Sequence, residues 1–154
     1  MIWASLGPPL GTIPNEARAY MTRIFHLTTT SALKAGLADD YAPAGWEREG
    51  FIHCSPDAAT VLAVARSYFL ASTEPVLVLE IETDRLTAEC RFEAPAPLVG
   101  GGAHRTPGKL FPHVYGRIDR AAIGRVGKLS RSSDGFVWPD AWESLNEPAS
   151  AAEP

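Results

Sequence analysis

The sequence GFIHCSPD, residues 50–57, joins a short strand to the start of a helix. FIHC at 51–54 is apolar and typical of a buried strand. Ser55-Pro56-Asp57 has the features of a helix start: a capping hydroxyl, a proline at the first helical position and an acid in the first turn. We therefore predict a helix capped by Ser55. Its apolar residues recur at helical spacing, so one face packs on a sheet: Val61, Leu62, Ala65, Tyr68 and Phe69.

Strand-like segments lie on both sides of this unit. The most apolar of them, VLVLEIE at 76–82, is expected to be the central strand. A second helix, TSALKAGL, is expected after the first strand, capped by Thr30 or Ser31. Many strands and few helices predict an α+β domain. The other expected strands are RIFHLT (23–28), CRFE (90–93), FPHVYG (111–116) and a last one near 123–129.

The length of 154 residues suits one domain. Residues 1–20 are rich in Gly and Pro without a sustained period, so we interpret them as a flexible leader, either an extension or a start-site artefact before Met21. Residues 21–145 are the expected domain. The small-residue segment at 146–154 is expected to be a disordered tail.

Charge and composition exclude several classes of protein. The net charge of −4 resides in residues 130–154, and the neutral remainder offers no basic face for duplex nucleic acid. No segment approaches the ~20 apolar residues that span a bilayer, and the first residues make a poor signal peptide. Cys54 and Cys90 have neither zinc-site nor disulfide spacing, so we expect reduced thiols. By elimination we expect a cytoplasmic protein without a membrane partner.

Three histidines on expected strands are each followed two residues later by a hydroxyl residue. The pairs are His26 with Thr28, His53 with Ser55, and His113 with Tyr115. Because side chains alternate across a strand, both members of a pair share one face. Neighbouring strands would collect these groups in one cleft, with His26 on its rim. Imidazole suits acid–base work and the orientation of ribose or phosphate oxygens.

Charged residues near these strands are further candidates. Glu93 follows the strand at 90–93 and is the expected acid partner, with Glu80 and Glu82 as competing carboxylates. The Gly/Pro-rich loop before the FPHVYG strand is about 16 residues long, and loops of that length are commonly functional. It would bring Arg105 and Lys109 to the mouth of the cleft. These cations serve either phosphate recognition or a solvated face.

The motifs IFHLT, GFIHCS, LVLEI, RFE and LFPHVYG together resemble the small bacterial family catalogued as domain of unknown function 952. The resemblance covers about residues 22–129. It implies an ADP-ribosyltransferase-like fold: small split antiparallel or mixed sheets with few helices, and NAD bound between the sheets.

The resemblance also implies roles for individual residues. His26 corresponds to the histidine that contacts the NAD ribose in many such transferases, and His53 and Ser55 fall on the second motif strand. The third motif usually carries a catalytic glutamate, whereas this chain has His113 and Tyr115, which argues against classical mono-ADP-ribosyl transfer to protein.

We therefore expect a nucleotide-binding domain, either a transferase acting on NAD or one acting on a phosphorylated nucleotide. Its small-molecule partner is a nucleotide, and no metal is expected. The expected catalytic residues are His53, His113 and Glu93, and the expected binding residues are His26, Thr28, Ser55, Tyr115, Lys109 and Arg105.

Three alternatives remain open at this point. FHLT and IHCS can be read as the two H-x-[ST] motifs of a 2H phosphoesterase, although 27 residues is a short separation for two lobes. The three histidines could hold zinc with an open position. A non-catalytic module that senses a nucleotide is the third, and it would be favoured if no carboxylate accompanied the histidines.

Overall fold

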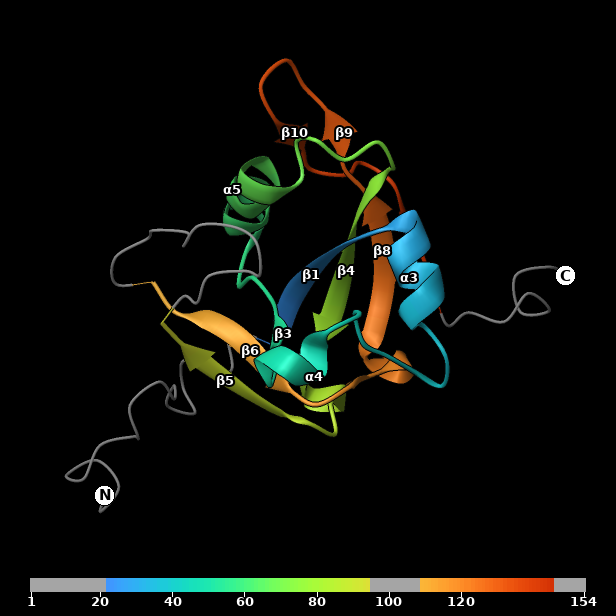
Figure 1. Cartoon of the computed structure of the whole chain (residues 1–154), viewed down its shortest axis with the longest axis vertical. Coiled ribbons are helices and arrows are strands. Elements are labelled where there is room, and N and C mark those ends of the chain that lie inside the picture. The colour runs from blue at the N-terminus through green and yellow to red at the C-terminus, as the bar shows by residue number, and fades with distance from the viewer. Residues whose placement is uncertain (1–21, 95–108, 146–154) are drawn as a thin grey trace, which may run out of the picture.

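The computed structural model describes residues 22–94 and 109–145, and Figure 1 shows their arrangement. The predictions about the leader, the tail and Arg105 concern residues outside these ranges. The helices are α3 (Thr30–Gly36), α4 (Trp46–Glu49) and α5 (Ala58–Tyr68), with 3-10 turns η1 (Thr83–Arg85) and η2 (Arg120–Ala122). The strands are β1 (Arg23–Thr29), β2 (Asp40–Tyr41), β3 (Ile52–His53), β4 (Val76–Glu82), β5 (Glu89–Glu93), β6 (Phe111–Tyr115), β7 (Ile118–Asp119), β8 (Ile123–Lys128), β9 (Ser130–Arg131), β10 (Phe136–Val137) and β11 (Trp142–Glu143).

The largest sheet has the strand order β1-β4-β8-β11, and its neighbours are antiparallel. β4 lies inside this sheet, as its apolar sequence predicts, and β1 pairs with it along its whole length. Alternation sends Leu27 and Val78 to the face covered by α5, where they pack with Val61 and Ala65. Ile24 and Leu79 face the other way into a second cluster, which also holds Ile52 and Val114.

A smaller sheet has the order β3-β6-β5 and lies beside the first in Figure 1. The ladder between β3 and β6 is limited by Pro112. The amide of Cys54 donates to the Pro112 carbonyl at 3.0 Å, but Pro112 has no N–H to return the bond. The β3–β6 ladder therefore ends at His53, and the chain is free to turn toward the first sheet.

The two sheets are joined through Ser55. Ser55 and Phe25 exchange backbone hydrogen bonds of 2.7 and 2.9 Å, which ties the segment after β3 to β1. This pairing corrects the predicted helix start. Ser55 is held as extended backbone, as expected before a proline, and the cap is Asp57, whose carboxylate accepts from the amide of Thr60 at 2.8 Å.

The cap predicted for α3 is also wrong by one residue. Thr29 is the N-cap and accepts from the amide of Ala32 at 3.3 Å, whereas Ser31 binds the carboxylate of Glu74. The fold class is confirmed at the level of mixed α and β content, with few helices and small antiparallel sheets. No helix within the described ranges is long and apolar enough to cross a membrane.

Candidate functional site

A cavity of about 190 Å³ lies where β1, β3, β6 and α5 meet, beside α4. Its wall is mainly aromatic and aliphatic, and the segment 43–55 contributes a large part of it. The polar lining comes chiefly from histidines and one carboxylate. The lining residues include His26, Trp46, Glu49, Phe51, His53 and His113.

His53 and His113 stand directly opposite each other on β3 and β6. Their ring centroids are 5.7 Å apart with an interplanar angle of 76°. Because opposed residues of an antiparallel pair project to the same face, both rings border the cavity. The predicted proximity of these two histidines, here called the histidine pair, is confirmed.

His113 is held by Glu93, as the sequence suggested. The ring is 3% exposed, and its Nδ1 lies 2.7 Å from Oε1 of Glu93, which also accepts from the Tyr115 hydroxyl at 2.6 Å. Burial lowers the pKa of His113 below its ordinary value and outweighs the opposing effect of Glu93. For Glu93, burial pushes the pKa upward, but the bonds from Tyr115 and His113 together bring it below its ordinary value. His113 is therefore a neutral imidazole that donates a hydrogen bond to the carboxylate of Glu93.

His53 has a carboxylate partner of its own. Its Nε2 is hydrogen-bonded to the carboxylate of Glu49, the last residue of α4. Gly45 and Gly50 bracket this helix with φ of 83° and 91°, a left-handed conformation that disfavours side chains. The two glycines let the chain turn sharply on both sides of α4, so that Glu49 reaches back to His53.

Phe51 connects the two imidazoles. Its ring stacks on His113 with centroids 4.2 Å apart and an interplanar angle of 21°, and it meets His53 edge-on at 4.9 Å. Such contacts restrict the rotation of both histidine rings. The histidine pair is therefore oriented by packing as well as by carboxylates.

His26 has a different environment from the one predicted. It is 7% exposed and contributes to the cavity wall, but its Nδ1 lies 2.7 Å from the carbonyl of His53 and its Nε2 lies 3.0 Å from the Tyr41 hydroxyl. Burial lowers its pKa to about 4. His26 is thus a neutral structural group that fastens β1 to β3, and it does not lie on the rim of the cleft.

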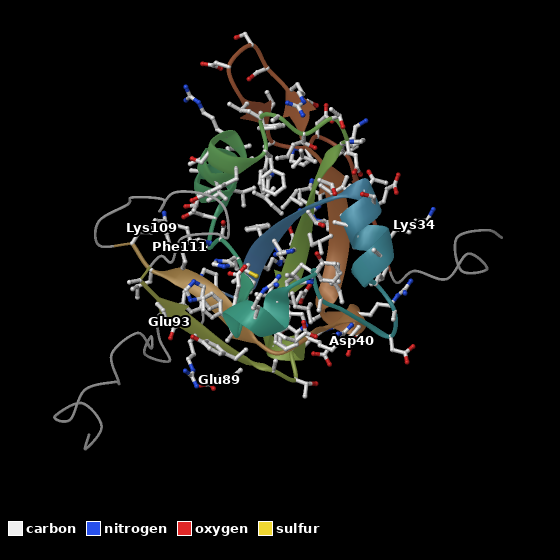
Figure 2. All side chains as sticks on the ribbon, viewed as in Figure 1. Lys34, Asp40, Glu89, Glu93, Lys109 and Phe111 are labelled. Atoms are coloured by element: carbon white, nitrogen blue, oxygen red, sulfur yellow. The ribbon has the colours of Figure 1, made fainter. Side chains whose placement is uncertain are left out.

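The other predicted binding residues separate into those at the cavity and those beside it. Ser55 lines the cavity. Thr28 is buried, 3.3 Å from the Tyr41 hydroxyl. Tyr115 and Glu93 do not line the cavity; Tyr115 bonds Glu93, and its ring centroid lies 5.4 Å from that of Phe51, which does line it. Lys109 was expected at the mouth, but its ammonium binds Asp57 at 2.9 Å, near the start of α5. Figure 2 labels Lys109, Phe111 and Glu93 in this region.

The competing carboxylates lie elsewhere. Glu80 accepts from Arg125 at 3.0 Å on the large sheet, and Glu82 does not line the cavity. Cys54 is buried, and burial raises the pKa of its thiol well above the ordinary value, which disfavours the nucleophilic thiolate.

The arrangement favours acid–base or hydrogen-bonding chemistry by two imidazoles, each paired with a carboxylate. A three-histidine zinc site requires His26, whose ring nitrogens both have protein partners. No group of three metal-ligating side chains occurs within residues 22–94 and 109–145. The catalytic site of a 2H phosphoesterase likewise requires His26 as a catalytic histidine with a ring nitrogen open to the substrate.

Sequence reasoning missed Glu49, Phe51, Trp46 and Tyr41. The one usable signal was the pair of glycines around WERE at 46–49, which marks a short turn ending four residues before His53. Tyr41 gave no signal, because its link to His26 depends on tertiary packing. Trp46 lines the cavity, and its Nε1 is buried without a hydrogen-bond partner in the described structure.

Comparisons with known proteins place the chain in a family. Protein CC0527 from Caulobacter crescentus has a similar crystal structure, with a TM-score of 0.59 and 22% identity over 75% of this chain and 92% of that one. A double mutant of CC0527 gives the same TM-score and coverage at 21% identity. Identity this low shows a shared fold alone. No curated protein matches the chain. Residues 26–126 match the family described as Protein of unknown function (DUF952), and the chain therefore belongs to that family.

Proposed function

We propose that the protein binds a nucleotide in this cavity, with a planar ring against the aromatic wall and the sugar at the histidine pair. The observation that carries the proposal is the histidine pair itself, held by two carboxylates at an aromatic-lined cavity. Ligand sites commonly combine an apolar wall with a few fixed polar groups. Such a site is also where acid–base residues are found.

The size of the cavity limits what enters it. A volume of about 190 Å³ is smaller than the roughly 300–1,000 Å³ typical of pockets for drug-sized ligands. One nucleoside unit, rather than a whole dinucleotide, is the part that we expect inside. NAD would then place one half in the cavity and the rest outside.

The charges around the cavity also favour a nucleotide whose base and sugar lie inside and whose phosphate lies outside. Among the described residues, the lining has no Lys or Arg and includes the carboxylate of Glu49. An anionic phosphate is disfavoured next to carboxylates, whereas the neutral base and sugar are not.

Turnover is part of the proposal because both histidines have carboxylate partners, the feature that a simple sensing module does not require. We propose an ADP-ribosyltransferase-like domain that acts on NAD or a related nucleotide. The two small antiparallel sheets with a cavity at their junction support this relation. In this reaction class the glycosidic bond to nicotinamide breaks, and an acceptor nucleophile takes the ADP-ribosyl group.

Isothermal titration with NAD, ADP-ribose, AMP and nicotinamide mononucleotide tests the binding. We expect at least one to bind, and His113→Ala to weaken it about tenfold or more, on the order of one lost hydrogen bond in a buried site. Glu89→Gln is a matched surface control, because Glu89 lies on the same strand as Glu93, both labelled in Figure 2, and its carboxylate accepts from Arg91. Release of nicotinamide from NAD, followed by chromatography, tests turnover. Failure of all four ligands to bind would overturn the proposal.

A further inference from the structure

The two carboxylates determine which ring nitrogen of each histidine carries the proton. A carboxylate only accepts, so the neutral ring of His113 donates through Nδ1 to Glu93. When its ring is neutral, His53 by the same reasoning donates through Nε2 to Glu49. The nitrogens that remain are Nε2 of His113 and Nδ1 of His53, and in the neutral rings both carry lone pairs.

These two nitrogens have no protein partner among the described residues. Trp46 Nε1 is the one enclosed side-chain atom without a partner in that part of the chain, so Nε2 of the largely buried His113 is reached from the cavity. Two lone pairs cannot hydrogen-bond to each other. The histidine pair therefore requires a group that supplies two donors across a short distance.

From this geometry we infer that the histidine pair recognises a vicinal diol, the 2′- and 3′-hydroxyls of a ribose, each hydroxyl donating to one imidazole. The inference rests on the proposed function and names the part of the ligand that the histidine pair contacts. It assigns ribose recognition to His53 and His113 instead of His26, whose ring nitrogens both have partners inside the fold.

A phosphate is the rival occupant, and the surroundings of the histidine pair argue against it. Phosphate oxygens accept hydrogen bonds at neutral pH and would meet lone pairs instead of donors. Each ring is bonded to an acidic side chain, Glu49 or Glu93. Arg91 lies opposite His113 across the β5–β6 ladder, but its guanidinium bonds Glu89 and lies over the Tyr115 ring. Lys109, the lysine that the sequence suggested for phosphate recognition, is bound to Asp57.

The test compares AMP with 2′-deoxy-AMP and 3′-deoxy-AMP by titration calorimetry on the full chain. We expect each deoxy compound to bind about 10- to 100-fold more weakly than AMP, because its missing hydroxyl leaves a buried acceptor unpaired. In His113→Ala and in His53→Ala the preference for AMP should fall to about threefold or less.

Positioning is tested with Glu49→Gln, which lets the side-chain amide either donate to or accept from His53 and so no longer fixes its tautomer. We expect the preference for AMP to fall in this variant, while Glu47→Gln, an exposed change on the same helix, keeps it. Long-range ¹H–¹⁵N NMR of the imidazoles reports the tautomer directly. Thermal unfolding shows which variants remain folded.

The binding experiments separate the inference from the proposed function. Equal binding of AMP and its deoxy forms would overturn the inference and leave the proposed function standing. Failure of every nucleotide would remove both. Equal weakening of AMP and deoxy-AMP by His113→Ala would assign another group of the ligand to the histidine pair. Tight binding of Zn²⁺ that both histidine variants abolish, without any preference for a diol, would also overturn it.

Discussion

Replacing Glu93 by Gln tests whether a carboxylate fixes the state of His113. The substitution keeps the shape and an accepting oxygen but removes the charge. Oε1 of Glu93 accepts from both His113 and Tyr115, at 2.7 and 2.6 Å. Hydrogen bonds to charged groups contribute about 1.5–3 kcal/mol, against about 0.5–1.5 kcal/mol for neutral ones. Because the Glu93 side chain is 29% exposed, water screens part of that difference.

We therefore expect Glu93→Gln to lower the free energy of unfolding by about 1 kcal/mol at pH 7, measured by urea denaturation. The contribution depends on pH in a defined direction. The pKa of Glu93 is lowered in the folded state, so its stabilisation is complete above the ordinary value of 4.5 and is lost as pH falls through the folded value. The difference between wild type and Glu93→Gln should shrink below pH 4.5.

NMR titration of His113 gives the second readout. Glu93 raises the pKa of His113 against the larger effect of burial, so its removal should lower that pKa further. Glu89→Gln, on the same strand but exposed, should change neither quantity. An unchanged or higher pKa of His113 in Glu93→Gln, with stability equal to that of Glu89→Gln, would refute the reasoning.

Four further predictions concern the scaffold around the site. Asp57→Ala should lower the free energy of unfolding by about 1 kcal/mol through loss of the α5 cap, with a smaller effect for Ser55→Ala; thermal denaturation that ranks the two the other way would contradict the cap assignment. Gly50→Ala should lower the free energy of unfolding by about 1 kcal/mol, because the φ of Gly50 is 91°. A variant as stable as wild type in urea would contradict a requirement for glycine at the end of α4. Tyr41→Phe should cost about 1–3 kcal/mol by leaving Nε2 of His26 unpaired. Because burial lowers the pKa of His26 to about 4, the unfolded state protonates first, and stability should fall as pH drops from 6.5 toward 4; a flat profile of unfolding free energy in that range would contradict this.

Several elements followed from local sequence patterns alone. The alternating apolar residues of β1 and β4 predicted strands, and the helical spacing after Asp57 predicted α5. Alternation also put His53 and His113 on definite faces of their strands. The family resemblance carried by these motifs agrees with the match over residues 26–126.

Other features depended on pairings between distant parts of the chain. Ser55 looked like a cap because hydroxyl, proline and acid followed one another, but its backbone pairs with Phe25, thirty residues earlier. Lys109 looked free for a phosphate, yet Asp57 lies within reach once α5 is in place. His26 had the same local pattern as His53 and His113.

The sequence by itself determined the strands β1, β3, β4, β5, β6 and β8, the direction in which each histidine projects and the family to which the chain belongs. These follow from backbone geometry, which repeats every two residues in a strand and 3.6 in a helix. Only the tertiary structure decided which histidines border the cavity with a ring nitrogen free of protein partners. That outcome depends on what lies across from each ring: the His53 carbonyl and Tyr41 enclose His26, whereas Glu49 and Glu93 each occupy one nitrogen of their histidine and leave the other without a partner in the described structure.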